Sequence, residues 1–180
     1  MQQDKSLLPF GGFATLVEFQ YKKLQKIFQE VYIISKDIEK FPFEASFIEE
    51  KYPVYAPTAG FVTMYETLKK ERFFVLGVDL PFVDLSVIEQ LLKEDNTGVD
   101  VTVAATKDFT EALCGVYHKS AEKKFQQMLQ NNTHKLQKAL QELQTHYVTF
   151  EEVWKFTNLN TPQEYQKALQ LYDIINQKKE

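Results

Sequence analysis

The sequence predicts an α/β fold with a doubly wound, mostly parallel sheet and helices on both faces. Short runs of β-branched and aromatic residues alternate along the chain with amphipathic segments of about ten residues, which is typical of β-α-β units. One run, residues 73–78, is apolar throughout, as in a strand that helices cover on both faces. No repeat or low-complexity tract divides the 180 residues, so we expect a single domain over residues 1–180.

The predicted helices follow from apolar residues three or four positions apart. Thr15 and Glu18 form a capping box at the start of the first helix, which covers residues 15–28. Thr161 and Pro162 supply an N-cap and a first-turn proline to the last helix. The same spacing predicts four further helices, at residues 61–68, 84–92, 120–129 and 135–143.

The predicted strands are shorter and carry β-branched or aromatic side chains. They lie at residues 31–34, 45–48, 73–78, 100–104 and 113–117, with a weaker one at 146–148. The chain begins with a loop and a helix, and no strand precedes them, which is unusual for a doubly wound sheet.

The charge balance and the cysteine content exclude several classes of protein. A net charge of −4 and a pI near 5.5 are unlike a nucleic-acid or anionic-membrane binder, which needs a basic surface. The single cysteine, Cys114, allows neither an intramolecular disulfide nor a cysteine zinc cage, and its apolar flanks indicate a core position. His118, His134 and His146 show no metal-ligand spacing and are expected at the surface. No apolar run could span a membrane and the polar N-terminus lacks a signal-peptide core, so we expect a cytoplasmic protein.

Asp79 is the first candidate for chemistry because it directly follows the apolar run 73–78. In an open parallel sheet, ligands bind beyond the carboxyl ends of the strands. A carboxylate there is a natural ligand of Mg²⁺, which prefers one or two carboxylates together with substrate phosphates. A simpler interpretation is that Asp79 only caps the turn before Pro81, and the residue pattern leaves both open.

Two further places could bind an anion. Lys5, in the loop before the first helix, could neutralise phosphate charge, although a lysine near a chain end is more often simply solvated. Asn158 and Asn160 stand just before the last helix, whose N-terminal N–H groups attract anions. The simpler interpretation is that Asn160 or Thr161 is no more than a helix cap.

Four short motifs carry a family resemblance. They are residues 4–8 (DKSLL), 56–60 (APTAG), 78–82 (VDLPF) and 158–162 (NLNTP). In this order they resemble signature elements of the molybdenum cofactor guanylyltransferases (MobA-type). These elements are the end of a glycine-rich loop, a Gly-Pro-x-x-Gly turn with alanine for its first glycine, a metal-binding aspartate segment and an Asn-x-Asn-Thr-Pro element. The resemblance spans the chain from Asp4 to the last helix and implies a nucleotide-diphospho-sugar transferase-like fold.

The resemblance implies a Mg²⁺-dependent nucleotidyltransferase that moves GMP from GTP to the terminal phosphate of molybdopterin carrying molybdenum, with release of pyrophosphate. A molybdoenzyme or a molybdenum-insertion protein would be a further partner. As catalytic residues, Lys5 would contact the GTP phosphates and Asp79 would hold Mg²⁺. The other implied roles are nucleotide binding by Glu50 and Gly60 and acceptor-side binding by Asn158 and Asn160.

The sequence departs from this family at two places. The family has an asparagine after its second strand, where this chain has Ile34 and Ser35. Met1 corresponds to a methionine inside the family's signature loop, so we expect an N-terminally truncated domain without the first strand and most of the glycine-rich loop. That loss would weaken the grip on the triphosphate and leave two strand edges exposed. Two explanations stay open: a gene product that starts further upstream, or a genuinely shortened protein.

Two other functions remain open from the sequence. A cytidylyltransferase, or another nucleotidyltransferase with a small phosphate acceptor, would keep the fold and change the substrate. A non-catalytic module that binds the cofactor or a partner enzyme through residues 158–162 would account for the missing loop. Competition among GTP, CTP and ATP separates the two enzymes, and stabilisation by nucleotide separates both from the binding module.

Overall fold

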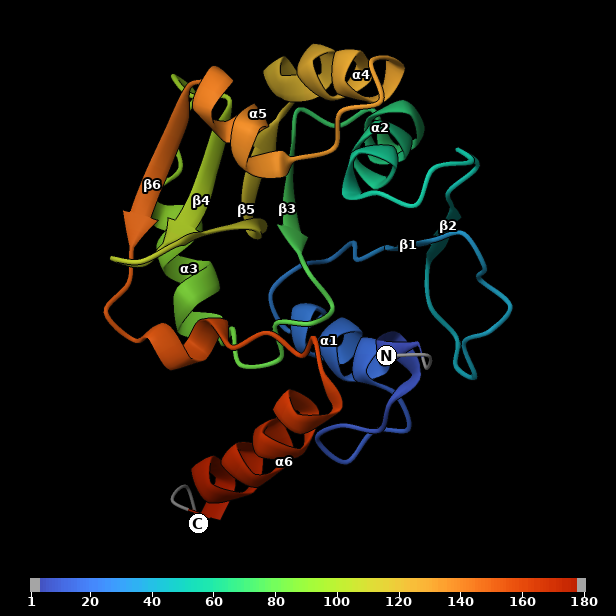
Figure 1. The fold of residues 1–180 in the computed structure, drawn as a ribbon, viewed down its shortest axis with the longest axis vertical. Helices are drawn as coiled ribbons and strands as arrows, with labels where there is room; N and C mark the ends of the chain where they lie inside the picture. The colour runs from blue at the N-terminus through green and yellow to red at the C-terminus, as the bar shows by residue number, and fades with distance from the viewer. Residues whose placement is uncertain (1–3, 178–180) are drawn as a thin grey trace. The chain divides into compact units, whose positions relative to one another are not determined.

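The computed structural model describes residues 4–177, so Met1, which the resemblance matches to a methionine of the family's signature loop, lies outside the described residues. The chain forms two compact units, each built from separate stretches. The described part of unit 1 consists of residues 4–31, 77–85 and 152–177, and unit 2 consists of residues 32–76 and 86–151. Unit 1 therefore contains both the blue and the red ends of the chain in Figure 1. The expectation of one domain over residues 1–180 stays a prediction.

Unit 2 contains a four-stranded sheet in the order β3-β5-β4-β6. Its strands are β3 (Arg72–Leu76), β5 (Thr110–His118), β4 (Val101–Ala105) and β6 (Thr145–Thr149). β4 and β6 are parallel, whereas β5 runs antiparallel to both β3 and β4. Since β3, β4 and β6 share one direction, the α/β class with a mostly parallel sheet is confirmed, and β5 is the reversed strand of this sheet.

The reversal of β5 arises because a tight turn, and not a helix, joins it to β4. The Thr106 N–H donates to the Phe109 carbonyl over 2.8 Å. The Thr106 hydroxyl oxygen accepts from the N–H groups of Asp108 and Phe109, each over 3.2 Å. A side-chain oxygen that satisfies the N–H groups of its own turn lets the chain reverse within a few residues. The sequence pattern predicted both strands but not the hairpin between them.

A second, two-stranded sheet in unit 2 pairs β1 (Ile33–Ser35) with β2 (Phe47–Glu49) in parallel. Both strands begin two residues later than the apolar pattern predicted. β3 is one of the two edge strands of the larger sheet, in which it pairs with β5 alone. Within residues 4–177, β1 and β2 pair only with each other. An edge position explains why the apolar side chains of β3 are only half-buried, instead of being covered on both faces as the sequence predicted.

One hydrophobic core joins α2 (Pro57–Leu68), α4 (Glu122–Gln130) and α5 (Leu136–Glu142) to one face of the larger sheet (Figure 1). All five residues of β4 are buried. The rings of Phe61 and Phe125 stack with their centroids 4.2 Å apart, and the Tyr117 ring lies 4.5 Å from that of Phe61. These three rings come from α2, α4 and β5, so they hold both helices against the sheet.

The helix α3 (Leu85–Glu94) is associated with the opposite face of the sheet. Successive side chains of a strand point to opposite faces, so Thr102 points away from Val101 and Val103, which belong to the core with α2, α4 and α5. Asp95, directly after α3, accepts a hydrogen bond of 2.8 Å from the Thr102 hydroxyl. Helices thus cover both faces of the sheet, as the predicted fold class requires.

Asp95 is the centre of a buried polar cluster. Its side chain is 0% exposed, it accepts from Arg72 Nη1 over 2.9 Å, and it lies 2.9 Å from His118 Nε2. Burial raises the pKa of the Asp95 carboxyl, but hydrogen bonds from His118, Thr102 and Arg72 outweigh burial and bring the pKa below its ordinary value. The prediction of a surface position for His118 is wrong, because its side chain is only 13% exposed and is held by Asp95.

We expect Asp95→Asn to destabilise the fold by about 2 kcal/mol at neutral pH, because a neutral amide cannot replace the charge-assisted hydrogen bonds. Since the folded pKa of Asp95 lies below its ordinary value, its contribution is complete above about pH 4 and is lost as the pH falls through the folded pKa. Urea unfolding of the wild type and the variant from neutral pH to about pH 2 should therefore show a shrinking difference. A difference that stays constant in acid would contradict this prediction, and Asp108→Asn in the exposed turn is the control.

Unit 1 is helical. It contains α1 (Leu16–Leu24) and α6 (Pro162–Gln177) together with two 3-10 turns, η1 (Lys5–Leu7) and η3 (Val153–Phe156). The Thr15 hydroxyl oxygen accepts from the Glu18 N–H over 3.2 Å, so the predicted cap of α1 is confirmed. One buried apolar cluster of this unit is formed by Phe10, Leu16, Phe82, Leu159 and Ala168.

A glycine turn brings Phe10 into this core. Gly11 and Gly12 have φ values of 59° and 82°, in the left-handed region, and Phe10 and Phe13 exchange two backbone hydrogen bonds across them. A Cβ atom on Gly11 would lie 2.6 Å from the ring of Phe19, so the turn also requires glycine for space. Phe10 then meets the rings of Phe19 and Tyr172 edge-on, each at 5.1 Å, which joins the two ends of the chain.

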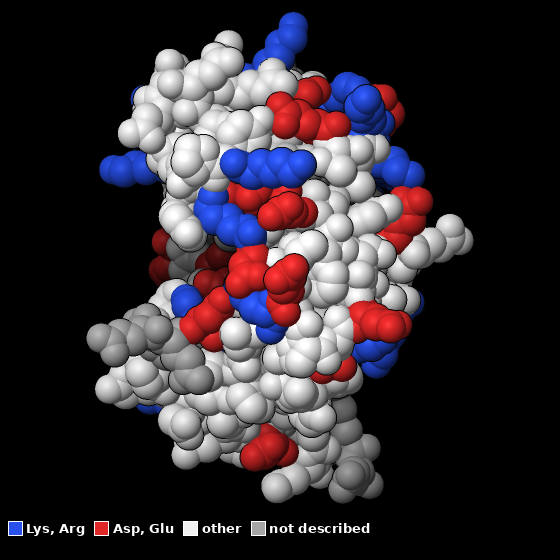
Figure 2. Space-filling view, turned by 90° about the vertical axis from the view of Figure 1, so that its right-hand side faces the viewer, with Lys and Arg blue, Asp and Glu red and all other residues white. Residues whose placement is uncertain are grey.

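The remaining expectations about the fold are largely confirmed. Each predicted helix is present, although α1 ends at Leu24, four residues before the predicted end. Cys114 is fully buried, as its apolar flanks indicated. No helix among residues 4–177 is long and apolar enough to cross a membrane. Acidic and basic side chains adjoin one another on the face displayed in Figure 2, and that face carries no broad basic surface.

Candidate functional site

The loop of residues 77–83 follows β3 and presents Asp79 at its turn. The Leu80 N–H donates to the Gly77 carbonyl over 3.3 Å, which closes the turn around Asp79. The Asp79 carbonyl accepts from the Leu159 N–H over 3.1 Å, so the peptide of this residue is tied to the segment before α6. The side chain of Asp79 is 25% exposed. The backbone of the loop is therefore fixed while the acidic group stays accessible.

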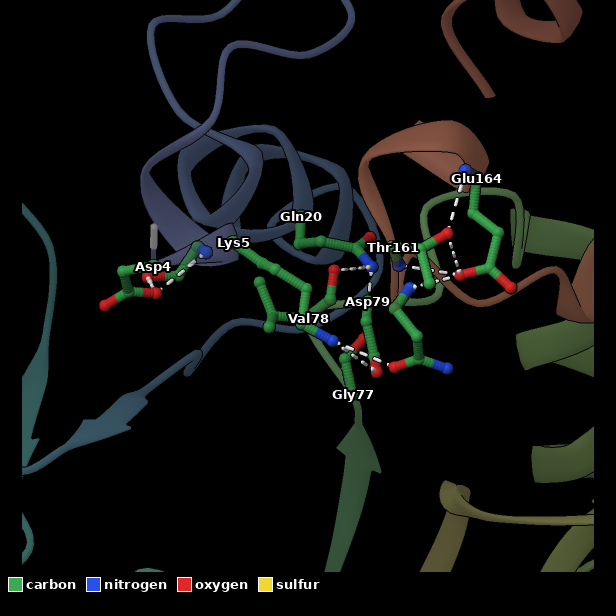
Figure 3. Close-up of polar contacts among 10 residues, drawn as sticks. Asp4, Lys5, Gln20, Gly77, Val78, Asp79, Thr161 and Glu164 are labelled. Atoms are coloured by element: carbon green, nitrogen blue, oxygen red, sulfur yellow. Dashed lines mark hydrogen bonds and ion pairs between the residues drawn. The ribbon is translucent and has the colours of Figure 1, made fainter. Parts of the chain in front are cut away.

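Three of the residues singled out from the sequence converge in unit 1. Lys5 Nζ donates to Asn160 Oδ1 over 2.9 Å. The same nitrogen lies 3.9 Å from Asp79 Oδ2, and Figure 3 displays Lys5 and Asp79 side by side. Lys5 belongs to η1, Asp79 to the loop after β3 and Asn160 to the segment before α6, so each comes from a different stretch of the chain. Asn158 lies on the same segment as Asn160 and is half-buried. The structure thus joins an ammonium, a carboxylate and an amide at one place.

Local hydrogen bonds fix the turn that carries Lys5. Asp4 is the N-cap of η1, and its Oδ1 accepts from the Ser6 N–H over 3.0 Å and from the Ser6 hydroxyl over 2.7 Å. Such a cap replaces the missing backbone partners at the start of a turn. Asp4 therefore orders the chain directly beside Lys5.

A capping box fixes the segment that carries Asn160. Glu164 Oε2 accepts from the N–H groups of Asn160 and Thr161 over 2.9 and 2.7 Å, and the Thr161 hydroxyl oxygen accepts from the Glu164 N–H over 3.2 Å. Hydrogen bonds from the Thr161 side chain and backbone, and from the Asn160 N–H, lower the pKa of Glu164. Thr161 is thus the helix cap that the sequence predicted, which leaves the Asn160 side chain to bind Lys5.

The protein groups around Asp79 could bind Mg²⁺ only if water and substrate phosphates supply most of its ligands. Within residues 4–177, the Asp79 carboxylate accepts no hydrogen bond, and its ion partner is Lys5. No group of three or more His, Cys, Asp or Glu in this range could hold a metal ion by protein ligands alone. One accessible carboxylate beside a lysine suits a Mg²⁺ ion that takes its other ligands from water and substrate phosphates. The predicted metal role of Asp79 is compatible with the structure and stays a prediction.

Sequence reasoning missed two side chains of α1 that contact the Asp79 loop. Gln20 Nε2 donates to the carbonyls of Gly77 and Val78 at 3.3 and 3.4 Å (Figure 3). It also donates to the Leu80 carbonyl at 3.0 Å. Lys23 Nζ donates to two further carbonyls of the loop. The signal that could have found Gln20 is its position four residues after Leu16, a polar side chain on the apolar face of a helix.

Glu50 and Gly60, the other two predicted nucleotide-binding residues, lie in unit 2. Glu50 follows β2, and its Oε1 is 2.7 Å from Lys36 Nζ; Lys36 in turn follows β1. Gly60 lies in the first turn of α2, where an added Cβ would be 3.8 Å from Glu50 Oε2. Since β1 and β2 are parallel, Lys36 and Glu50 stand at the carboxyl ends of neighbouring strands, the usual place for ligands. Lys36 was not among the predicted site residues.

Two histidines make side-chain contacts, and within the described part of the chain neither belongs to a group that could hold a metal ion. His134 Nδ1 is 2.6 Å from the Thr58 hydroxyl, and His146 Nε2 is 3.5 Å from Glu94. Both are half-buried, so the expected surface positions are only partly correct.

Comparison with known proteins gives the fold and the family. Among solved structures, molybdopterin-guanine dinucleotide biosynthesis protein A from Archaeoglobus fulgidus aligns with a TM-score of 0.80 at 22% identity, over 94% of this chain and 90% of that one. A 2-C-methyl-D-erythritol 4-phosphate cytidylyltransferase from Thermus thermophilus aligns with a TM-score of 0.73 at 15% identity, over 94% and 93%. The fold is therefore that of the nucleotidyltransferases.

The family follows from sequence comparison. The model of the MobA-like NTP transferase domain matches residues 1–147. A molybdenum cofactor guanylyltransferase from Campylobacter jejuni is 33% identical over 169 residues, which is 93% of this chain and 87% of that protein. The chain belongs to the MobA-like NTP transferase family, as the four motifs predicted.

Proposed function

We propose that this protein transfers GMP from GTP to the terminal phosphate of molybdopterin carrying molybdenum. A phosphate oxygen of the acceptor forms a bond to the α-phosphorus of GTP, the bond from that phosphorus to the bridging oxygen breaks, and pyrophosphate leaves. The observation that carries the proposal is that the Asp79 carboxylate and the Asn160 amide both lie within 4 Å of the Lys5 ammonium group. The names of the Campylobacter jejuni and Archaeoglobus fulgidus relatives support it.

Each of the converging residues has a role that its chemistry suits. Lys5 neutralises phosphate charge and steadies the leaving pyrophosphate, since an ammonium group is a strong point-charge donor to phosphate. Asp79 would hold Mg²⁺, which when bound supplies positive charge beside the phosphates. Asn158 and Asn160 bind on the acceptor side through their amides. Glu50 and Gly60 remain predicted nucleotide contacts, each within unit 2.

A transfer assay with molybdopterin and Mg²⁺ tests the proposal. Labelled GTP should yield the guanine dinucleotide and pyrophosphate, whereas CTP and ATP should not compete. The assay is run on this chain and on a version extended by the codons that precede Met1. If both versions are folded and neither transfers GMP, the guanylyltransferase proposal is wrong. Preferential use of CTP would favour the alternative function, a cytidylyltransferase. The cytidylyltransferase from Thermus thermophilus has the same fold as this chain.

We expect Lys5→Met to lower kcat/KM for GTP about a hundredfold, because the variant loses the positive charge beside Asp79 while keeping most of the side-chain volume. The measurement is steady-state GMP transfer at varied GTP and saturating acceptor. Lys167→Met, which removes an exposed lysine from α6, is the matched control and should leave kcat/KM unchanged. Equal values for wild type and Lys5→Met would remove Lys5 from the site.

A further inference from the structure

The carbonyl groups of the Asp79 loop are bound by side chains from one face of α1. Gln20 Nε2 donates to Gly77, Val78 and Leu80 at 3.0–3.4 Å. Lys23 Nζ donates to Pro81 at 3.1 Å and to Val83 at 2.6 Å. The carbonyl of Asp79 itself, as described above, is bound by the segment before α6.

The geometry points to a positioning role: we propose that Gln20 and Lys23 hold the Asp79 loop in the shape that presents its carboxylate to a divalent cation and GTP. The proposal rests on the proposed function and adds two residues to it. Both side chains act through the backbone carbonyls of the loop. These two side chains donate to five carbonyls on either side of Asp79. Two of these carbonyls, those of Gly77 and Leu80, also accept a backbone hydrogen bond within the loop, at 3.3 and 3.4 Å.

The environment of Gln20 favours this role over ordinary packing. Gln20 is 5% exposed on the buried face of α1, a place where an apolar residue would pack without any hydrogen-bonding requirement. Its Oε1 is buried and has no hydrogen-bond partner among the described residues, so one polar atom is left unsatisfied while Nε2 serves three carbonyls. A flipped amide would turn Oε1 toward the same carbonyl oxygens, which repel it. The amide is therefore needed for its donor group.

The hydrogen bonds of Lys23 also support the positioning role. Its ammonium group is half-buried and reaches carbonyls that follow Asp79, whereas Gln20 reaches carbonyls on both sides. An ammonium group donates stronger hydrogen bonds than an amide because it is charged. Since Gln20 and Lys23 are three positions apart on α1, they lie on the same face of the helix. One helix thus supplies side-chain donors to carbonyls before and after Asp79.

Hydrogen exchange tests the loop without any ligand. In Gln20→Met the side chain keeps its length and apolar volume but loses both donors, so amides of residues 77–85 should exchange about tenfold faster. Gln25→Met, at the exposed end of the same helix, is the control and should leave these rates unchanged. Lys23→Met should act in the same direction. Unchanged exchange in both Gln20→Met and Lys23→Met would overturn the proposal.

Cation affinity tests whether the order of the loop serves the site. Manganese, as the spin-active probe, is titrated with GTP present and its free fraction is followed by electron paramagnetic resonance. Gln20→Met should raise the Kd for Mn²⁺ about tenfold, with the thermal unfolding midpoint measured in parallel. Gln20→His keeps an Nε2–H donor at similar reach and should recover most of the affinity. A purely structural role would lower the midpoint of both variants without this pattern of loss and recovery in Kd.

The possible outcomes separate the proposal from the function on which it rests. Faster exchange with weaker Mn²⁺ binding, recovered by Gln20→His, supports the positioning role. Faster exchange with an unchanged Kd overturns it, because the loop would then be ordered for another reason. A wild-type chain that binds neither Mn²⁺ nor GTP overturns the proposed function and the cation half of this inference, while the exchange rates still decide the loop half.

Discussion

Asp79→Asn should reduce GMP transfer by at least about a thousandfold while leaving the fold intact. The amide keeps the shape of the side chain but removes the negative charge that a Mg²⁺ ligand must supply, a loss of several kcal/mol in the transition state. The fold should tolerate the change, because the carboxylate accepts no hydrogen bond within residues 4–177 and its ion pair with Lys5 spans 3.9 Å.

The measurement is the Mg²⁺-dependent rate of GMP transfer at saturating GTP, together with a thermal unfolding curve. Asp173→Asn, an exposed aspartate on α6, is the matched control and should be as active as the wild type. If Asp79→Asn keeps most of its turnover, Asp79 does not hold the metal, and the proposed assignment of the site has to be abandoned.

Phe125→Ala should destabilise unit 2 by about 4 kcal/mol. Phe125 is 0% exposed, stacks on Phe61 at 4.2 Å, and lies 5.8 Å from the ring of Tyr117. Removing it leaves a cavity between α2, α4 and the sheet, which these rigid elements can only partly close.

Urea unfolding followed by circular dichroism checks this value. Phe109→Ala makes the same change in the β4–β5 turn, where the ring is 38% exposed, and should cost less than about 1 kcal/mol. Similar losses for the two variants would mean that the aromatic cluster does not carry the stability assigned to it here.

The fold class was predictable because helix and strand periods alternate clearly along this chain. What periodicity could not predict was the pairing of strands that are distant in sequence. The apolar run of β3 looked like a fully covered strand, yet β3 lies at the edge of its sheet and is half-buried. The direction of β5 depended on the Thr106 hydroxyl and its local turn, a feature that hydrophobic patterning does not register.

The candidate site was predictable in its parts and not in its assembly. Lys5, Asp79 and Asn160 each had a plain alternative explanation in the sequence, and only their convergence in unit 1 favours the functional one. Gln20 was not predicted, because a glutamine among apolar residues only interrupts the apolar face of a helix. The sequence pattern does not indicate that its amide donates to carbonyls of a loop about 60 residues away.

The construction of unit 1 from three separate stretches has a consequence during synthesis on the ribosome. Lys5 and Asn160 are 155 positions apart, so the bond between them can form only after the strands and helices of unit 2, which lie between them in sequence, have been made. Until then, the apolar residues Phe10 and Leu16 lack the partners that α6 and its preceding segment provide. The site that joins Lys5, Asp79 and Asn160 is therefore assembled only after the segment before α6 has been synthesised.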